Sequence, residues 1–226
     1  MTRFDHVMSL IILVAIMAAN SAGAREASAD FRRDSHDPPM ASEAPSEPSV
    51  LQRVARDVEG LAVTGNRELF GPKGADLVVV VFVTTTCPIA NASMPSIRRL
   101  HELASKSEVD MVLVHPDPLV TPEAAREHAD RRKLAMDILL DPGQVLARQL
   151  GARVVPEAFL LHRVEGDWEI RYRGPVDDLY AGVGRRRRAA TTFHVHDAIQ
   201  RIRAGLPIER PIRTAHGCAI ERMVGS

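Results

Sequence analysis

The apolar run at 77–83, LVVVVFV, constrains the fold more than any other stretch of this sequence. Its β-branched residues do not alternate with polar ones, which predicts a strand at Val78–Val83 buried on both faces of a sheet. Three threonines follow, and then Cys87 and Pro88. Apolar residues at helical spacing continue to about Lys106: Met94, Ile97, Leu100, Leu103 and Ala104. A central strand is therefore expected to lead directly into a helix.

Strand and helix signals alternate after this unit. Val109–His115 reads as a second buried strand, and His115, Asp117 and Pro118 are expected to shape the loop that follows it. Thr121-Pro122-Glu123 combines an N-cap residue, a proline and an acid, which predicts a helix running to about Lys133.

Asp141-Pro142-Gly143-Gln144 repeats this pattern, with Asp141 as the expected N-cap and Gln144 placed to complete a capping box. This predicts a short helix that ends at Gly151.

The last third of the chain predicts a hairpin and a final helix. Ala158–His162 and Trp168–Arg173 are expected to pair antiparallel around a Val-Glu-Gly-Asp turn. A helix is expected at about Thr192–Ala204, ending at Gly205. The order β-α-β-α-α-β-β-α predicts an α/β fold with a mixed central sheet and helices on both faces.

The N-terminal 50 residues read as targeting and linker sequence. Residues 1–24 contain an apolar stretch and an Ala-Gly-Ala site, which predicts a secretory signal cleaved after Ala24. Residues 25–50 are rich in Ala, Ser, Pro and acids and are expected to form a disordered linker. The folded domain is expected at 51–226, with a tail at 206–226. A periplasmic or secreted location follows, in which two cysteines can form a disulfide.

The overall charge gives no sign of a polyanionic partner. The formal net charge is zero, so neither nucleic acid nor stable membrane insertion after signal cleavage is expected. The densest basic stretch, Arg185–Arg188, is interpreted as a solvated turn.

Cys87 stands where a strand passes into the first turn of a helix. Unpaired backbone N–H groups and the helix dipole favour a thiolate there, so the pKa of this thiol is expected to fall. Asn91, one turn further, is expected either to hydrogen-bond near the thiolate or to cap a backbone group.

The motifs around these residues resemble the thioredoxin-like redoxin family, and more narrowly its exported AhpC/TSA peroxiredoxin-like members. The resemblance rests on Thr-x-x-Cys-Pro at 84–88 and on the stretch DPGQVLARQLGARVVPEAFLL, and also on YRGPVDD and the late GCAI. It covers about residues 55–222 and implies a thioredoxin-like fold.

The resemblance also implies roles for individual residues. Cys87 would be the attacking cysteine, and Pro156 would follow Val155 through a cis peptide whose backbone edge faces the partner. Pro88, Val155 and Glu157 would line the partner's binding site, with Glu157 either tuning Cys87 or pairing with an arginine.

Two departures from the family patterns bear on the reaction. Ala90 stands where a thioredoxin carries its second cysteine, so exchange within one turn is excluded. Thr84 fits the catalytic threonine of peroxiredoxins, but Val80 stands where their proline belongs.

Cys218, the second cysteine, is therefore the candidate partner of Cys87. If the tail folds back, Cys218 would resolve a sulfenic acid or mixed disulfide at Cys87. A permanent structural disulfide and two thiols that never meet are the other interpretations.

The sequence thus predicts an exported thiol-dependent oxidoreductase, either a thiol-disulfide oxidoreductase that acts on a protein disulfide or a peroxiredoxin-like antioxidant enzyme that acts on peroxide. No organic cofactor is implied. One alternative is a non-catalytic binding module with a structural Cys87–Cys218 disulfide. Another is a copper carrier of the Sco type using Cys87 and a histidine. No metal ligands are assigned, because on a helix His194 and His196 would point roughly 200° apart.

Overall fold

The computed structural model describes residues 53–54, 61–62 and 74–222. The predicted signal at 1–24 and linker at 25–50 lie outside these residues. The chain divides into two units, 1–47 and 48–226, and every described residue belongs to the second. Among the described residues, no helix has the length and apolarity that a membrane crossing requires.

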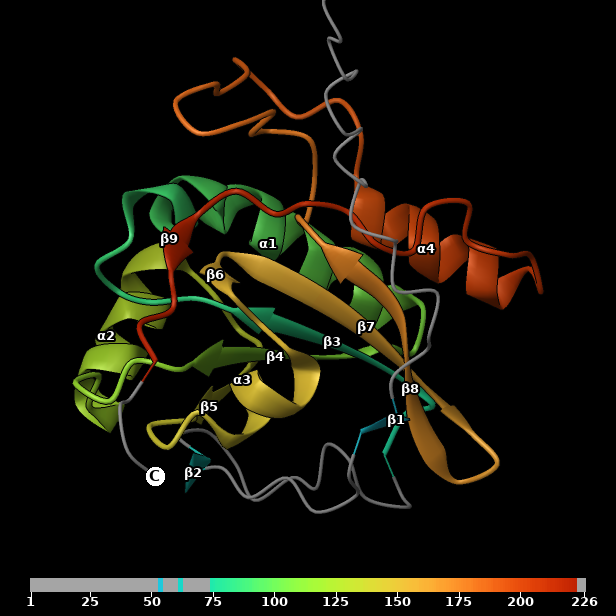
Figure 1. Cartoon of the computed structure of the whole chain (residues 1–226), viewed down its shortest axis with the longest axis horizontal. Coiled ribbons are helices and arrows are strands. Elements are labelled where there is room, and N and C mark those ends of the chain that lie inside the picture. The colour runs from blue at the N-terminus through green and yellow to red at the C-terminus, as the bar shows by residue number, and fades with distance from the viewer. Residues whose placement is uncertain (1–52, 55–60, 63–73, 223–226) are drawn as a thin grey trace, which may run out of the picture. The chain divides into compact units, whose positions relative to one another are not determined.

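A mixed sheet of seven strands forms the centre of the described unit (Figure 1). Its strand order is β1-β8-β7-β3-β4-β5-β2, in which β3, β4 and β5 run parallel and the remaining neighbours pair antiparallel. The strands are β1 (Arg53–Val54), β2 (Leu61–Ala62), β3 (Leu77–Phe82), β4 (Asp110–His115), β5 (Asp137–Leu140), β7 (Glu157–Val164) and β8 (Asp167–Gly174).

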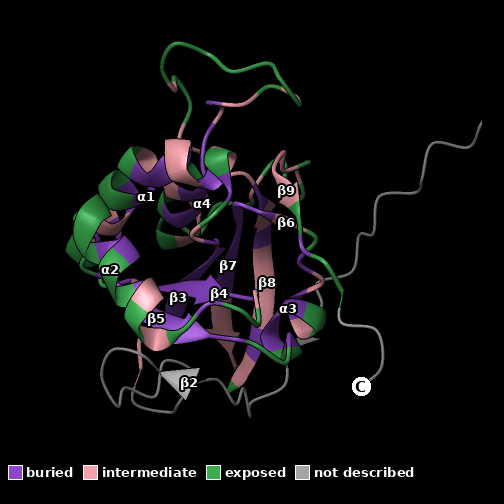
Figure 2. Ribbon diagram, turned by 90° about the vertical axis from the view of Figure 1, so that its left-hand side faces the viewer, coloured by how far each residue is buried: buried purple, intermediate pink, exposed green. Residues whose placement is uncertain are grey.

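Helices cover both faces of this sheet, as expected. They are α1 (Pro88–Lys106), α2 (Pro122–Arg132), α3 (Val145–Leu150) and α4 (His194–Arg203). Figure 2 shows α1, α2 and α4 on one side of the sheet and α3 on the other. The consecutive crossovers β3-α1-β4 and β4-α2-β5 step across the sheet in the same direction, so right-handed connections place both helices on one face.

The core lies around β3, which is buried along its whole length. Val80 pairs with Val112 of β4 on one side and with Phe159 of β7 on the other. Because helices cover both faces of the sheet there, no position of β3 needs a polar side chain. This confirms the central strand and the helix that follows it.

Two sequence expectations were wrong. Residues 137–140 form strand β5, which pairs with β4 in the seven-stranded sheet, although no strand was predicted there. The helix after Asp141 begins only at Val145, and Gln144 at φ 53° occupies its N-cap position without a side-chain cap. Asp141 still serves the helix from further back, since its carboxylate accepts from the backbone N–H groups of Leu146 at 3.3 Å and Ala147 at 2.8 Å. The Gln144 side chain is therefore free to bind elsewhere.

A second, two-stranded sheet carries the tail. It pairs β6 (Val154–Val155) antiparallel with β9 (Cys218–Ala219), so residues far apart in the sequence lie side by side. In Figure 1 the red tail strand β9 lies over the end of the molecule at which α1 begins. The described part of the predicted tail, to residue 222, thus folds back onto the domain.

Candidate active site

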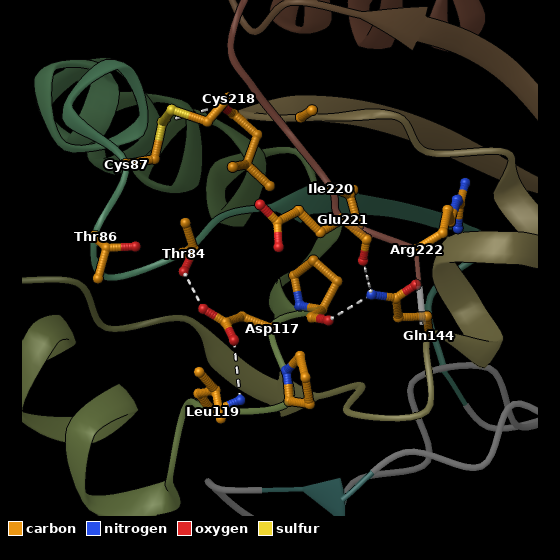
Figure 3. Close-up of a pocket in the computed structure, with 14 residues that line it drawn as sticks. Thr84, Thr86, Cys87, Asp117, Leu119, Gln144, Cys218, Ile220, Glu221 and Arg222 are labelled. Atoms are coloured by element: carbon orange, nitrogen blue, oxygen red, sulfur yellow. Dashed lines mark hydrogen bonds between the residues drawn. A yellow bond between two sulfur atoms is a disulfide. The ribbon is translucent and has the colours of Figure 1, made fainter. Parts of the chain in front are cut away.

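The carboxyl ends of β3 and β4 form one wall of a pocket of about 520 Å³ (Figure 3). Three segments line it, together with Gln144 and Val155: Thr84, Thr86 and Cys87 after β3, residues 116–119 after β4, and residues 218–222 of the tail. Ligands of open α/β sheets bind outside the carboxyl ends of the strands, which is the position of this pocket.

Cys87 is the N-cap residue of α1, with only 2% of its surface exposed. The backbone N–H of Ala90 lies 3.4 Å from its sulfur and points at it. Pro88 occupies the next position and is exposed beside the sulfur. In the reduced state, the Ala90 N–H and the positive end of the helix would stabilise a thiolate at Cys87.

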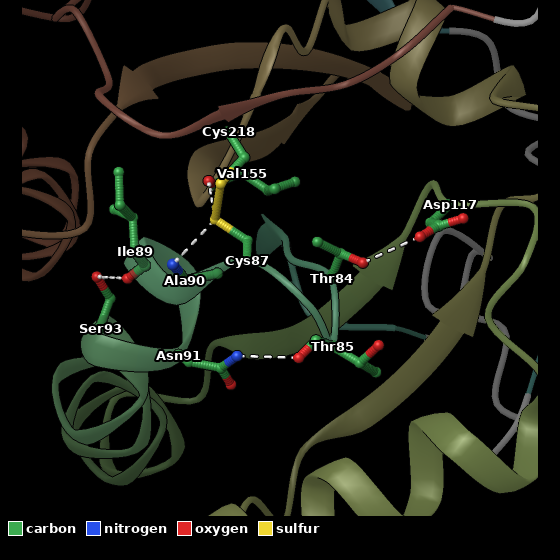
Figure 4. Close-up of a disulfide and its surroundings, with 10 residues drawn as sticks. All are labelled: Thr84, Thr85, Cys87, Ile89, Ala90, Asn91, Ser93, Asp117, Val155 and Cys218. Atoms are coloured by element: carbon green, nitrogen blue, oxygen red, sulfur yellow. Dashed lines mark hydrogen bonds between the residues drawn. A yellow bond between two sulfur atoms is a disulfide. The ribbon is translucent and has the colours of Figure 1, made fainter. Parts of the chain in front are cut away.

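Cys87 and Cys218 form a disulfide, with their Cα atoms 6.1 Å apart (Figure 4). This settles the question that the sequence left open, because the tail does bring the second cysteine to the first. The bond joins the start of α1 to β9, across 131 positions of the chain.

The Val155–Pro156 peptide is cis, as the family resemblance implied. The carbonyl oxygen of Val155 lies 3.3 Å from the sulfur of Cys87. Val155 is also the direct register partner of Cys218 in the β6–β9 pair. The disulfide is therefore enclosed between the start of α1 and the strand that precedes the cis-proline.

Gly217 allows the tail to approach this closely. A Cβ atom at this position would overlap the carbonyl group of Val155. Any side chain at 217 would therefore force β9 away from β6, and Cys218 away from Cys87.

Three further hydrogen bonds fasten the tail beyond Cys218. The N–H of Ile220 donates to the carbonyl of Arg153 at 2.9 Å, and Arg222 donates to the carbonyl of Ala152 at 2.6 Å. The buried Gln144 amide donates both to the Glu221 carbonyl at 2.7 Å and to the Pro116 carbonyl at 3.3 Å. Gln144 thus joins the tail to the loop after β4, which is the role that replaces the predicted capping box.

Glu157 supports the cis-proline segment and pairs with an arginine, one of its two expected roles. Its carboxylate is 3% exposed and accepts from Arg173 Nε at 2.7 Å. The second oxygen accepts from the backbone N–H of Arg153 at 2.7 Å. Arg173 also donates to the carbonyl of Gly151 at 2.6 Å. The pair therefore ties the residues before Pro156 to β8.

Thr84 faces the pocket, where its hydroxyl donates to the carboxylate of Asp117 at 3.3 Å. The same carboxylate accepts from the backbone N–H of Leu119 at 2.9 Å, as Figure 3 shows. Asp117, interpreted from the sequence as a loop residue, thus positions Thr84 and closes the β4–α2 loop.

Behind Cys87, Asn91 takes one of its two expected roles, but sequence reasoning missed its link to His128. Asn91 donates to the carbonyl of Thr85 at 2.9 Å, so it caps a backbone group (Figure 4). Its side-chain oxygen lies 2.8 Å from Nε2 of His128, which must donate this bond. The ring of His128 in turn lies edge-on to that of His115, with centroids 5.9 Å apart. The network holds the threonine loop in front of Cys87.

Burial lowers the pKa of both imidazoles of this network. Desolvation lowers the pKa of His115 to about 4, with the neighbouring His128 acting in the same direction and Asp117 opposing it. Desolvation, followed by Arg132 and Arg131, lowers the pKa of His128 as well. Neither ring nitrogen of His115 has a hydrogen-bond partner, so a proton there would have no counter-group.

We expect His115→Leu to reduce the loss of unfolding free energy between neutral and acid pH. The folded pKa lies below the ordinary value of 6.5, so the unfolded chain takes up the proton first. Above pH 6.5 the His115 imidazole does not lower the free energy of unfolding. As the pH falls toward 4, it lowers this free energy by about 3 kcal/mol in all. Urea unfolding at neutral and acid pH would measure this difference. An equal loss in the wild type and the leucine variant would contradict it.

Among the described residues, no cluster of three or more His, Cys, Asp or Glu side chains is arranged to hold a metal ion. His194 and His196 lie in the first turn of α4. Both cysteine sulfurs are committed to the disulfide in this structure.

Comparison with known proteins shows what part of the chain is similar to. The Redoxin family profile matches residues 68–173. A hypothetical protein from Sinorhizobium meliloti 1021 is 20% identical and superposes with a TM-score of 0.63, over 78% of this chain and 96% of that one. An uncharacterized conserved protein from Geobacillus kaustophilus, also 20% identical, gives 0.57 over 68% and 81%. No curated protein sequence matches the chain.

Proposed function

We propose that this chain, whose residues 68–173 match the Redoxin family profile, catalyses thiol–disulfide exchange through Cys87. The Redoxin match supports an oxidoreductase in general, as expected from the sequence. The choice of disulfide exchange, the residues and the compartment belong to the proposal.

One observation carries the choice of reaction. Cys218 reaches Cys87 on an extended segment that pairs with β6 beside the cis-proline. A protein substrate bound by main-chain pairing at the same sheet edge would present its cysteine in this way. The Thr84 hydroxyl, which peroxide chemistry would use, is instead bonded to Asp117. The geometry therefore favours a polypeptide disulfide over peroxide as substrate.

The reaction proceeds in two exchange steps from the reduced enzyme. The Cys87 thiolate attacks one sulfur of a partner disulfide, forming a mixed disulfide and releasing the other partner sulfur as a thiolate. The Cys218 thiolate then attacks the Cys87 sulfur, closing the internal disulfide and releasing the second partner thiolate. The partner gains two electrons and the enzyme loses two. The Ala90 N–H stabilises Cys87 as attacking and leaving group.

The other predicted site residues support the exchange. Pro156 and Val155 present the docking edge, and Glu157 fixes that edge through Arg173. Pro88 is exposed next to the disulfide, where a partner would contact it. The signal-like residues 1–24 support work outside the cytoplasm on exported thiol proteins.

A glutathione redox series tests the proposal. We expect the Cys87–Cys218 bond to open at potentials above about −300 mV, the range of working rather than structural disulfides. Trapping of free thiols with iodoacetamide and peptide mass spectrometry would follow both cysteines. A bond that resists reduction below that potential would instead support the binding module with a structural disulfide. Rapid consumption of peroxide by the reduced protein would move the assignment to peroxide reduction.

A further inference from the structure

We infer that the tail at 217–220 is a template of the substrate, so that the site selects an extended segment of the form Gly-Cys-x-apolar. This inference rests on the proposed function and names the substrate class of the same site. The partner is a polypeptide whose disulfide cysteine follows a glycine and precedes an apolar residue by two positions.

The main chain sets the position of the cysteine. β9 pairs antiparallel with β6, placing Cys218 opposite Val155 and Ala219 opposite Val154. The Ile220 N–H continues the pattern by donating to Arg153, and the Glu221 carbonyl accepts from Gln144. All these contacts use backbone groups of the tail, so any extended peptide in this register can make them.

The position before the cysteine requires glycine. The carbonyl of Val155, which Cys87 also approaches, leaves no room for a Cβ atom at 217. Because this carbonyl belongs to β6, it cannot move without shifting the strand on which β9 pairs. A partner with any other residue there would have to bind further from Cys87.

The two positions after the cysteine differ in what they require. Ala219 is exposed, so this position places no demand on side-chain chemistry. Ile220 is 9% exposed and packs into the hydrophobic core. A polar residue at this position would lose apolar burial and leave its polar group without water.

The tail must leave before a partner can bind, and reduction allows this. The disulfide ties β9 covalently to the start of α1 and so keeps it paired with β6. Once it opens, a partner segment and the tail compete for the same edge. Resolution by Cys218 then returns the tail to its place and expels the product.

Peptides copied from residues 215–222 test the inference. Each carries its cysteine as a mixed disulfide with thionitrobenzoate and is mixed with full-length Cys218→Ser protein in the reduced state. The Cys87 thiolate attacks the peptide sulfur, and the coloured thionitrobenzoate thiolate leaves. We expect the Gly217→Ala and Ile220→Ser peptides to react at least about tenfold more slowly than the parent, equivalent to about 1.4 kcal/mol. The Ala219→Ser peptide is the matched control and should react at the parent rate.

The outcomes separate the inference from the function on which it rests. Equal rates for all peptides, or exchange with glutathionyl thionitrobenzoate but not with the peptides, would overturn the template while leaving Cys87 an exchange thiol. Failure to react with any of these disulfides, including the glutathione one, would overturn the proposed function. The remaining tail of the Cys218→Ser protein competes equally with every peptide, so it leaves the rate ratios unchanged.

Discussion

Serine in place of Cys87 is expected to abolish thiol exchange, whereas serine in place of Cys218 should stop only its second step. A serine hydroxyl at the start of α1 cannot form the thiolate that attacks a disulfide, so the rate should fall by on the order of 10³-fold or more. With Cys218→Ser, Cys87 still attacks, but nothing resolves the mixed disulfide. Mass spectrometry after oxidised glutathione should find one adduct on Cys87 in this variant.

The Cys87→Ser protein is the matched control for that experiment. Cys218 lies in β9 and is not itself the N-cap residue of a helix, so it should take up glutathione more slowly than Cys87 does. Faster modification of Cys218 than of Cys87 would place the reactive thiol in the tail and contradict the proposed order of steps.

Reduction of the disulfide is expected to lower the free energy of unfolding by up to about 5 kcal/mol. The bond closes a loop with a sequence separation of 131, and the chain-entropy treatment assigns a value of this size to so long a loop. Urea unfolding with and without reductant would measure the difference. The Cys87→Ser/Cys218→Ser double variant should match the reduced wild type and be insensitive to reductant. An oxidised protein no more stable than the double variant would contradict this expectation.

Two opposing effects set how easily the bond opens. A bond that adds about 5 kcal/mol to stability is by linkage harder to reduce in the folded chain. Its reduction potential is lower by on the order of 100 mV than that of the same bond in an unfolded chain. The helix N-terminus acts in the other direction, because it stabilises the Cys87 thiolate that reduction produces. The redox series measures the balance of the two, which decides between a structural and a working disulfide.

The long elements could be predicted because local signals and tertiary burial agree there. The apolar run of β3, the Thr121 cap of α2 and the Glu165-Gly166 turn each specify one structure. β5 was missed because its few apolar residues suit a short strand and a helix equally. Only pairing with β4 decides the matter.

Site residues that lie in a local motif could be predicted from the sequence. Contacts between distant segments could not. Cys87 and the cis-proline lie in recognisable motifs, and the structure brings them together. The bond from Gln144 to Glu221 joins residues 77 positions apart, and no periodicity encodes it. His128 and Asn91 likewise meet only because α1 and α2 pack on the same face.

The placement of the disulfide also orders events during synthesis. Cys87 leaves the ribosome 131 residues before Cys218, a delay of about 7–26 s at about 5–20 residues per second. The four helices of the described residues and strands β4 to β8 are made in that interval. Cys87 is therefore without its partner until β9 has been made, and correct pairing depends on a nearly finished domain. Oxidation to the native disulfide consequently reports that this chain has completed its fold.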